Sequence, residues 1–332
     1  MYEDYKTHDI AIYGGFLKND QELLECTSGG IATALARQMI RQGGCVAGVS
    51  YSDDFREAKY ELVKDEKGLE RFKGSKYVEV NKKNIYKDVK VLLEEGKGVL
   101  FFGLPCTVAA VKTFLKKEYD NLITCELICH GPVKTKVHTE YIDYLEKRFN
   151  SKIKDFSVRK KKGTWLPPYL YAEFVNGKVF EKEFYKTEYG CAFKIMGKKA
   201  CYCCKFKANN RIGDIMLGDF LLAAEQDIFW NHKGISVIFA HTEKGKDFLG
   251  TLEEVELFET DFEKAVSNNL MVIQSREKSP EKEYFEKMFE KNGLIYAAHR
   301  SKYFKKEVMH SATGHIPKVF RSFLKRVYNI KK

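Results

Sequence analysis

The chain has 332 residues, of which 44% are hydrophobic and 14% aromatic. This composition supplies a sizeable core and excludes an intrinsically disordered protein, and the length suggests two domains or one large domain with appendages. The 57 Lys and Arg residues exceed the 46 Asp and Glu residues by 11, and six of these cations lie between residues 317 and 332.

No apolar stretch is long enough to cross a bilayer. The longest, residues 99–111, is interrupted by Gly103 and Pro105, whereas a spanning helix needs about 20 apolar residues. The N-terminal residues lack the basic and apolar regions of a secretory signal. We therefore expect a cytoplasmic protein, in which the nine cysteines are thiols or ligands and not disulfides.

Helices and strands alternate in the first third of the chain. Thr27 or Ser28 can cap a helix over residues 29–42. Three apolar runs are typical of strands covered on both faces, at residues 45–51, 99–103 and 121–129. Helices are predicted between them, over residues 83–98 and from Pro105 to about residue 117. This alternation predicts an α/β fold whose mixed sheet has flanking helices.

The pattern changes near residue 151. A strand leads into a basic loop at residues 160–162, and Asn176-Gly177 joins two further strands in a hairpin. From about residue 260 the sequence is mostly helical and charged. We therefore predict an N-terminal FAD-binding α/β region over residues 1–115, a domain carrying the hairpin and a cysteine cluster over residues 116–260, and a helical basic tail over residues 261–332.

Four cysteines are candidates for a metal centre. Cys201 and Cys204 form a C-x-x-C pair, a spacing that lets two thiolates reach one metal or cluster. Cys106 and Cys129 follow predicted strands, and ligands gather at the carboxyl ends of parallel strands. Zinc, an iron–sulfur cluster and thiols without a cofactor all fit this spacing. Cys45 and Cys125 lie within apolar strands and are interpreted as core residues.

Two glycine-containing segments are candidates for binding a phosphate. Residues 26–30 open a helix whose backbone N–H groups suit a pyrophosphate, although on this motif alone an ordinary capped helix, with glycines for close packing, is the favoured interpretation. Lys76 and Tyr77 follow a glycine and could meet a phosphate and a ring. Asp214 and Asp219 flank a fourth apolar run, where we expect structural roles and a pair between Arg211 and Asp214.

These residues belong to five motifs that occur in a familiar order. They are C-T-S-G-G-I-A-T-A-L, F-K-G-S-K-Y-V, V-L-F-F-G-L-P-C, L-I-C-H-G-P, and the long run from C-Y-C-C-K-F-K to I-M-L-G-D-F. In this order, over about residues 10–255, the chain resembles the coenzyme F420 hydrogenase/dehydrogenase beta-subunit family. Within that family it is most similar to the bacterial members associated with polysaccharide biosynthesis.

The resemblance implies two cofactors. FAD would lie near Ser28, Gly29 and Gly30 and near Ser75, Lys76 and Tyr77, with Lys76 stabilising negative charge on the reduced ring. A 4Fe-4S cluster would be held by Cys106, Cys129, Cys201 and Cys204. The implied activity is that of an iron–sulfur flavoprotein oxidoreductase, which transfers electrons between a one-electron partner and a hydride donor or acceptor, either a deazaflavin or a compound of a glycan pathway.

The sequence departs from the family pattern at three places. It has no ferredoxin-like segment at its N-terminus, so we expect an external ferredoxin-like electron carrier. Leu104 and Thr107 flank Pro105-Cys106 where relatives read G-T-P-C-Q, and Leu221-Leu222 replaces a usual Trp-Gly, which puts the family's substrate pocket in question. The alternative function is a non-catalytic or zinc-binding scaffold of a polysaccharide pathway, with zinc at the same four cysteines.

The C-terminal tail has the pattern of a basic amphipathic helix. Its apolar residues recur at helical spacing between Ile316 and Val327, with cations mostly opposite. We expect residues 316–332 either to contact the inner membrane face peripherally or to pack on their own domain. No specific nucleic-acid binding is expected, because the basic runs carry no recognisable reader.

Overall fold

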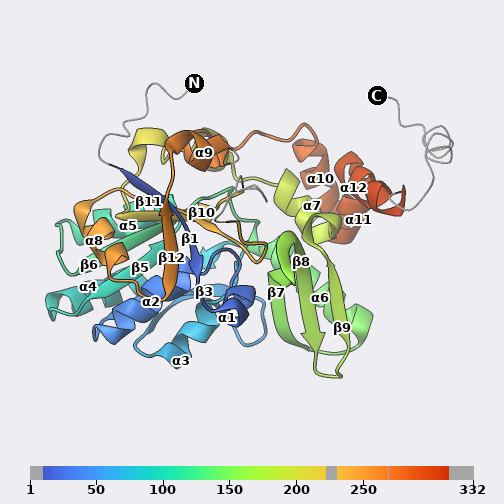
Figure 1. Cartoon of the computed structure of the whole chain (residues 1–332). Helices are drawn as coiled ribbons and strands as arrows, with labels where there is room; N and C mark the ends of the chain where they lie inside the picture. The colour runs from blue at the N-terminus through green and yellow to red at the C-terminus, as the bar shows by residue number, and fades with distance from the viewer. Residues whose placement is uncertain (1–9, 222–229, 268, 314–332) are drawn as a thin grey trace.

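The computed structural model describes residues 10–221, 230–267 and 269–313. A mixed sheet of nine strands, on the left in Figure 1, has the order β12-β1-β11-β10-β6-β5-β2-β3-β4. The strands are β1 (Ala11–Leu17), β2 (Cys45–Tyr51), β3 (Ala58–Val63), β4 (Val80–Asn81), β5 (Val99–Gly103), β6 (Leu122–Leu127), β10 (Ile215–Asp219), β11 (Ser236–Ala240) and β12 (Val255–Glu259).

Helices cover both faces of this sheet. Alternate side chains of each central strand point to opposite faces, so Val46 and Leu100 lie in one core with α2 and α8, while Ala47 and Phe101 lie in another with α4 and α5. The helices are α1 (Asp20–Glu25), α2 (Ile31–Arg41), α3 (Glu66–Leu69), α4 (Ile85–Glu94), α5 (Pro105–Leu115), α8 (Glu243–Gly250) and α9 (Phe262–Ser267), with the 3-10 turns η1 (Glu70–Phe72) and η5 (Leu270–Val272).

A separate antiparallel sheet of three strands stands beside the first (Figure 1). Its strands are β7 (Ile153–Lys162), β8 (Thr164–Phe174) and β9 (Val179–Glu183), and the predicted hairpin joins the last two, with Gly177 at φ +79°. Its helices and turns are α6 (Thr135–Phe149), α7 (Glu188–Ile195), α10 (Lys282–Asn292), α11 (Leu294–Arg300), α12 (Lys302–Thr313), η2 (Phe184–Lys186), η3 (Lys199–Cys203) and η4 (Ala208–Asn210).

The predicted fold class is confirmed. Two central strands have the predicted bounds, α5 begins at Pro105, and Cys45 and Cys125 are buried in the core. Two details are wrong. Helix α2 begins after Gly30, whose left-handed φ of +79° lets the backbone enter the helix without a side-chain cap from Thr27 or Ser28. Residues 160–162 are the end of β7 and not a loop.

Two predictions stay predictions. The larger sheet takes strands from both sides of residue 115, and the proposed boundaries near residues 115 and 260 are untested. The predicted amphipathic helix of residues 316–332 lies outside the described residues. Within the described ranges, no helix combines the length and apolar character that a membrane span requires.

Candidate functional site

The segments predicted to bind cofactors meet at one edge of the larger sheet. Strands β2, β5, β6 and β10 are parallel neighbours, so their carboxyl ends lie along the same edge. Strand β11 runs the other way and begins at this edge, where Ser236 pairs with Asp219. Ligands of open parallel sheets bind outside the carboxyl ends of the strands. We therefore expect a ligand-binding site at this edge of the larger sheet.

Three loops bring the four predicted metal-ligating cysteines to the edge. Cys106 is the second residue of α5 and is exposed, and Cys129 follows the end of β6. The Gly131 amide donates to Cys129 Sγ at 3.2 Å, and a Cβ atom on Gly131 would lie 3.1 Å from Cys201 Sγ. Gly131 thus lets the Cys129 loop and the C-x-x-C segment approach each other closely.

Neighbouring thiols of this set raise the pKa values of Cys129 and Cys201. Burial, followed by the nearby Cys106 and Cys201, raises the pKa of Cys129 to about 11. Burial, followed by Cys106 and Cys204, raises the pKa of Cys201. Among the residues that the structure describes, no three His, Cys, Asp or Glu side chains are arranged to hold a single metal ion. The thiols therefore share one locality without forming a closed one-ion site.

Two cations lie beside these thiols. Lys207 Nζ donates to the carbonyl oxygens of Cys129, at 3.3 Å, and Met271. Arg276 Nη1 donates to the carbonyl oxygen of His130 at 3.0 Å. Lys207 lowers the pKa of Cys129, and Arg276 lowers that of Cys201, each against the effect of burial. Four thiols with adjacent cations are a donor set that fits an anionic thiolate cluster.

A buried ion pair fixes the segment that follows the C-x-x-C pair. Arg211 Nη1 lies 3.4 Å from Glu126 Oε2, and both side chains are at most 2% exposed. Glu126 Oε1 also accepts from the Gly213 amide at 2.8 Å. The predicted pair between Arg211 and Asp214 is wrong, because the Asp214 carboxylate accepts from the amide and hydroxyl of Thr124 instead. Asp214 therefore has the expected structural role.

The Ser28–Gly30 turn packs closely against the start of β11. The Gly29 amide donates to Ser236 Oγ at 3.0 Å, and Ser28 Oγ donates to the Ile235 carbonyl at 3.0 Å. A Cβ atom on Gly29 would lie 2.2 Å from the carbonyl oxygen of Gly15. Glycine is therefore required here for close backbone approach, whatever the turn binds.

The segment from Ser75 to Tyr77 lies at the same edge. The Tyr77 ring stacks on Phe193 with a centroid distance of 4.6 Å. Burial raises the pKa of the Tyr77 hydroxyl, while interactions with Arg159 and Ser75 lower it. Lys76 Nζ does not point along the edge but lies within 3.2 Å of four carbonyl oxygens of its own turn.

The sequence interpretation missed two basic residues of this edge. Arg159 Nη1 lies 2.8 Å from Asp219 Oδ2, with side chains 10% and 23% exposed. Lys161 Nζ donates to the carbonyl oxygens of Leu23 and Ser28, each at 2.7 Å. Both cations project from β7 toward the larger sheet, since residues two apart share a strand face. The alternation of side chains along a strand could have identified this pair, but all four residues from 159 to 162 are basic, so the sequence does not show which of them point toward the larger sheet.

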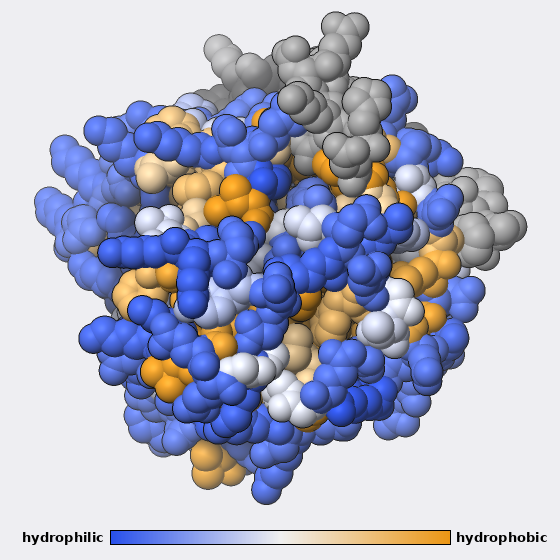
Figure 2. Space-filling view, turned by 90° about the vertical axis from the view of Figure 1, so that its left-hand side faces the viewer, coloured by the Kyte–Doolittle hydropathy of each residue, from blue (hydrophilic) through white to orange (hydrophobic). Residues whose placement is uncertain are grey.

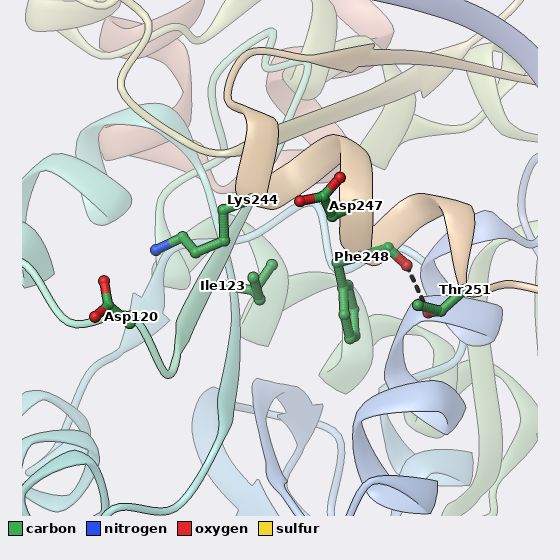
Figure 3. Close-up of a pocket in the computed structure, with 6 residues that line it drawn as sticks. All are labelled: Asp120, Ile123, Lys244, Asp247, Phe248 and Thr251. Carbon is green, nitrogen blue, oxygen red and sulfur yellow. Dashed lines mark hydrogen bonds between the residues drawn. The ribbon is translucent and has the colours of Figure 1, made fainter.

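A separate depression lies at the opposite edge, where the parallel strands begin. It measures about 500 Å³ and is lined by Asp120, Ile123, Lys244, Asp247, Phe248 and Thr251 (Figure 3). The Lys244 ammonium donates to the Tyr119 carbonyl at 3.2 Å. The side of the molecule that lies at the left of Figure 1 is mostly hydrophilic, with apolar side chains in small groups (Figure 2). This depression contains none of the predicted site residues.

Comparison with known proteins identifies the family. Residues 96–265 match the family described as the C terminus of the coenzyme F420 hydrogenase/dehydrogenase beta subunit. The chain belongs to this beta-subunit family. The matched residues span half of the chain and include Cys106, Cys129, Cys201 and Cys204, but neither glycine-containing segment.

A solved structure supports the fold. A chain of the F420-reducing [NiFe] hydrogenase complex from Methanosarcina barkeri, studied by xenon derivatization, aligns with a TM-score of 0.51 and 15% sequence identity. The alignment covers 92% of this chain and 93% of that one. At this identity the likeness concerns the fold. No curated protein matches the sequence, and the predicted bacterial polysaccharide branch stays a prediction.

Proposed function

We propose that this beta-subunit-like protein is an iron–sulfur flavoprotein oxidoreductase. It would pass electrons between a one-electron partner and a hydride donor or acceptor, either coenzyme F420 or a compound of a glycan pathway. The observation that carries the proposal is the meeting of four thiols from three loops at the carboxyl edge of the sheet. Family membership supports an oxidoreductase role related to coenzyme F420.

The proposed ligands of a 4Fe-4S cluster are Cys106, Cys129, Cys201 and Cys204. Each thiolate of such a cluster binds a different iron atom, so the thiols need not converge on one point. The mutual influence of the thiols and the adjacent Lys207 and Arg276 support this ligand set. When bound, the cluster would accept and release one electron at a time.

FAD is proposed to bind along the same edge, between the Ser28–Gly30 turn and Ser75–Tyr77. The cations Arg159 and Lys161 support this placement, because a pyrophosphate is anionic. Burial lowers the pKa of Lys161 to about 8, so a nearby anion would favour its charged form. When bound, the flavin would exchange a hydride on one side and single electrons on the other.

The surface around the cysteines supports an acidic protein as the electron carrier. Between residues 189 and 213 the chain has six Lys or Arg residues and no Asp or Glu. Lys194, Lys199 and Lys205 are exposed, and among the described residues none of them has an ion-pair partner. Ferredoxin-like carriers are acidic, and the complementary charge of these lysines would speed the encounter of such a carrier with this protein.

Cofactor analysis of anaerobically purified protein tests the proposed function. We expect about four iron atoms, about four acid-labile sulfides and one FAD per chain, with the visible absorption of both groups. A colourless protein with zinc bound, or with neither metal nor flavin, would overturn the proposal and favour the scaffold alternative.

A further inference from the structure

The side chain of Lys76 is bound by its own backbone. Its Nζ atom lies 3.2, 2.9, 2.7 and 3.0 Å from the carbonyl oxygens of residues Arg71, Phe72, Lys73 and Gly74. Four consecutive carbonyl groups thus converge on one cation. The left-handed φ of +82° at Gly74 turns the chain so that the fourth carbonyl joins the other three.

Hydrogen bonds to these carbonyl oxygens favour the charged form of Lys76, against the effect of burial, which lowers its pKa to about 7. In the described part of the chain, no carboxylate lies within ion-pair distance of Lys76, and the nearest ring, that of Tyr51, has its centroid 5.9 Å away. Neighbouring Lys73 behaves differently, because its Nζ pairs with Glu25 at 3.0 Å and Glu70 at 2.9 Å. Rings of carbonyl oxygens replace the hydration shell of ammonium and potassium ions.

The turn of residues 71–74 is packed against the larger sheet at Phe72, and the chain that follows it leads to the carboxyl edge of the sheet. A Cβ atom on Gly48 of β2 would lie 2.5 Å from the Phe72 ring, so Phe72 is seated on the sheet. Immediately after Lys76, the Tyr77 carbonyl accepts from the Val133 amide at 3.1 Å. Lys76 therefore connects the anchored turn to the residues at the edge.

We propose that the carbonyl oxygens of residues 71–74 form a monovalent-cation site, which the Lys76 ammonium fills from within the chain. By filling it, Lys76 positions Ser75 and Tyr77 at the edge of the sheet. Lys76 is then a positioning residue, and its charge is directed at the turn and not at a bound flavin. The proposal does not depend on the redox function.

The variant Lys76→Ala empties the site and makes it available to free cations. We expect its thermal midpoint to fall and to recover by about 2–4 °C in potassium or ammonium chloride, relative to tetramethylammonium chloride of equal ionic strength. Tetramethylammonium is too large for the ring of oxygens and cannot donate hydrogen bonds. Lys73→Ala is the matched control, since its partners are carboxylates, and we expect no such recovery.

Two results would overturn the proposal. One is an unchanged midpoint for Lys76→Ala, and the other is a recovery that is the same for all three salts. If Lys76 instead contacts FAD directly, the variant would lose flavin while the flavin-free protein kept its midpoint.

A second measurement on the unaltered protein covers the case in which the variant fails to fold. The acylation rate of each lysine is followed by mass spectrometry of its peptides. We expect Lys76 to react about tenfold more slowly than the exposed Lys64 and Lys67. Equal or faster reaction of Lys76 would show a free amine and contradict the site. Neither measurement requires iron or flavin, so a failure here is distinct from a failure of the proposed function.

Discussion

At the scale of single residues, the Glu126–Arg211 pair connects strand β6 to the segment that follows the C-x-x-C pair. Burying two charges is costly, and the cost is recovered only while both partners are present. Arg211 also donates to the carbonyl oxygens of Met271 and Val272, so it ties η5 to the same point. The pair holds the cysteine loop in place without touching a thiol.

We predict that Arg211→Met lowers the free energy of unfolding by about 3–5 kcal/mol, because it leaves the Glu126 carboxylate buried without a counter-charge. Glu126→Gln should cost less, since its amide oxygen still accepts from the Gly213 amide. Urea unfolding of the two variants measures the difference. A loss below about 1 kcal/mol for Arg211→Met would contradict the structural role of the pair.

His138 gives a prediction about pH. Burial lowers its pKa to about 4 from a usual value of 6.5, and its Nε2 lies 2.6 Å from the Phe55 carbonyl. Between these two pH values the unfolded chain binds the proton and the folded protein does not, so stability falls as the pH falls from 6.5 toward 4.

In this pH range the free energy of unfolding of His138→Phe should change less with pH than that of the unaltered protein. We expect the two slopes to differ by about 1.4 kcal/mol per pH unit. Phenylalanine keeps a ring that can stack on Tyr51, as the imidazole does at 5.3 Å. Urea unfolding at pH 6.5, 5.5 and 4.5 measures the slope. The same slope in both proteins would refute the assignment of a neutral buried His138.

At the scale of elements, the start of α2 depends on contact with a strand more than 200 residues later in the chain. We predict that Gly29→Ala destabilises the protein by about 1–3 kcal/mol or more, because its Cβ would lie 2.2 Å from the Gly15 carbonyl oxygen and 2.5 Å from the amide nitrogen of Ser236 in β11. Gly250→Ala in α8 is the control, since nothing lies within 4 Å of its Cβ and we expect no loss. Similar midpoints of thermal unfolding for the two variants would contradict the close packing.

Elements with local signals could be predicted from the sequence. Strands β2 and β5 are short apolar runs between breakers, α5 starts at a proline, and Asn176-Gly177 marks the hairpin of β8 and β9. The four cysteines could be selected because C-x-x-C spacing and strand ends are visible in the sequence. The loop positions of Cys106 and Cys129 then followed from the topology.

Contacts between distant segments could not be predicted. The Gly29–Ser236 contact and the Arg159–Asp219 pair join segments that are far apart in the chain, and the sequence does not show that these segments lie close together in space. The direction of the Lys76 side chain depends on the left-handed conformation of Gly74, which brings the Gly74 carbonyl oxygen to the Lys76 ammonium beside the other three. Pairing of Arg211 with Glu126 instead of Asp214 likewise depends on which carboxylate Thr124 already satisfies.

At the scale of the whole molecule, the proposed site lies where the larger sheet meets the three-stranded sheet. Arg159 and Lys161 of β7 contact Asp219 and Ser28, so one sheet completes the edge of the other. The basic segment of residues 189–213 contains the C-x-x-C pair, and its exposed lysines are Lys194, Lys199 and Lys205. An electron carrier bound there would lie close to the proposed cluster.

Replacing Lys194, Lys199 and Lys205 with Glu tests this surface. With a reduced acidic two-iron ferredoxin as donor, we expect electron transfer to slow about tenfold or more at low ionic strength, and the difference to shrink in salt. The control replaces Lys82, Lys83 and Lys87, which are also exposed. An equal loss in both triple variants would show that only net charge matters and would exclude a specific docking surface.

The proposed function requires that Cys106, Cys129, Cys201 and Cys204 hold an iron–sulfur cluster. Electron paramagnetic resonance of the anaerobically reduced protein tests it most directly, with Cys204→Ser compared against Cys203→Ser, its exposed neighbour. We expect the signal of a reduced 4Fe-4S cluster in the unaltered protein and in Cys203→Ser, and its loss in Cys204→Ser. A reduced, iron-loaded protein whose signal is unchanged in Cys204→Ser, or a protein that binds no iron, would contradict it.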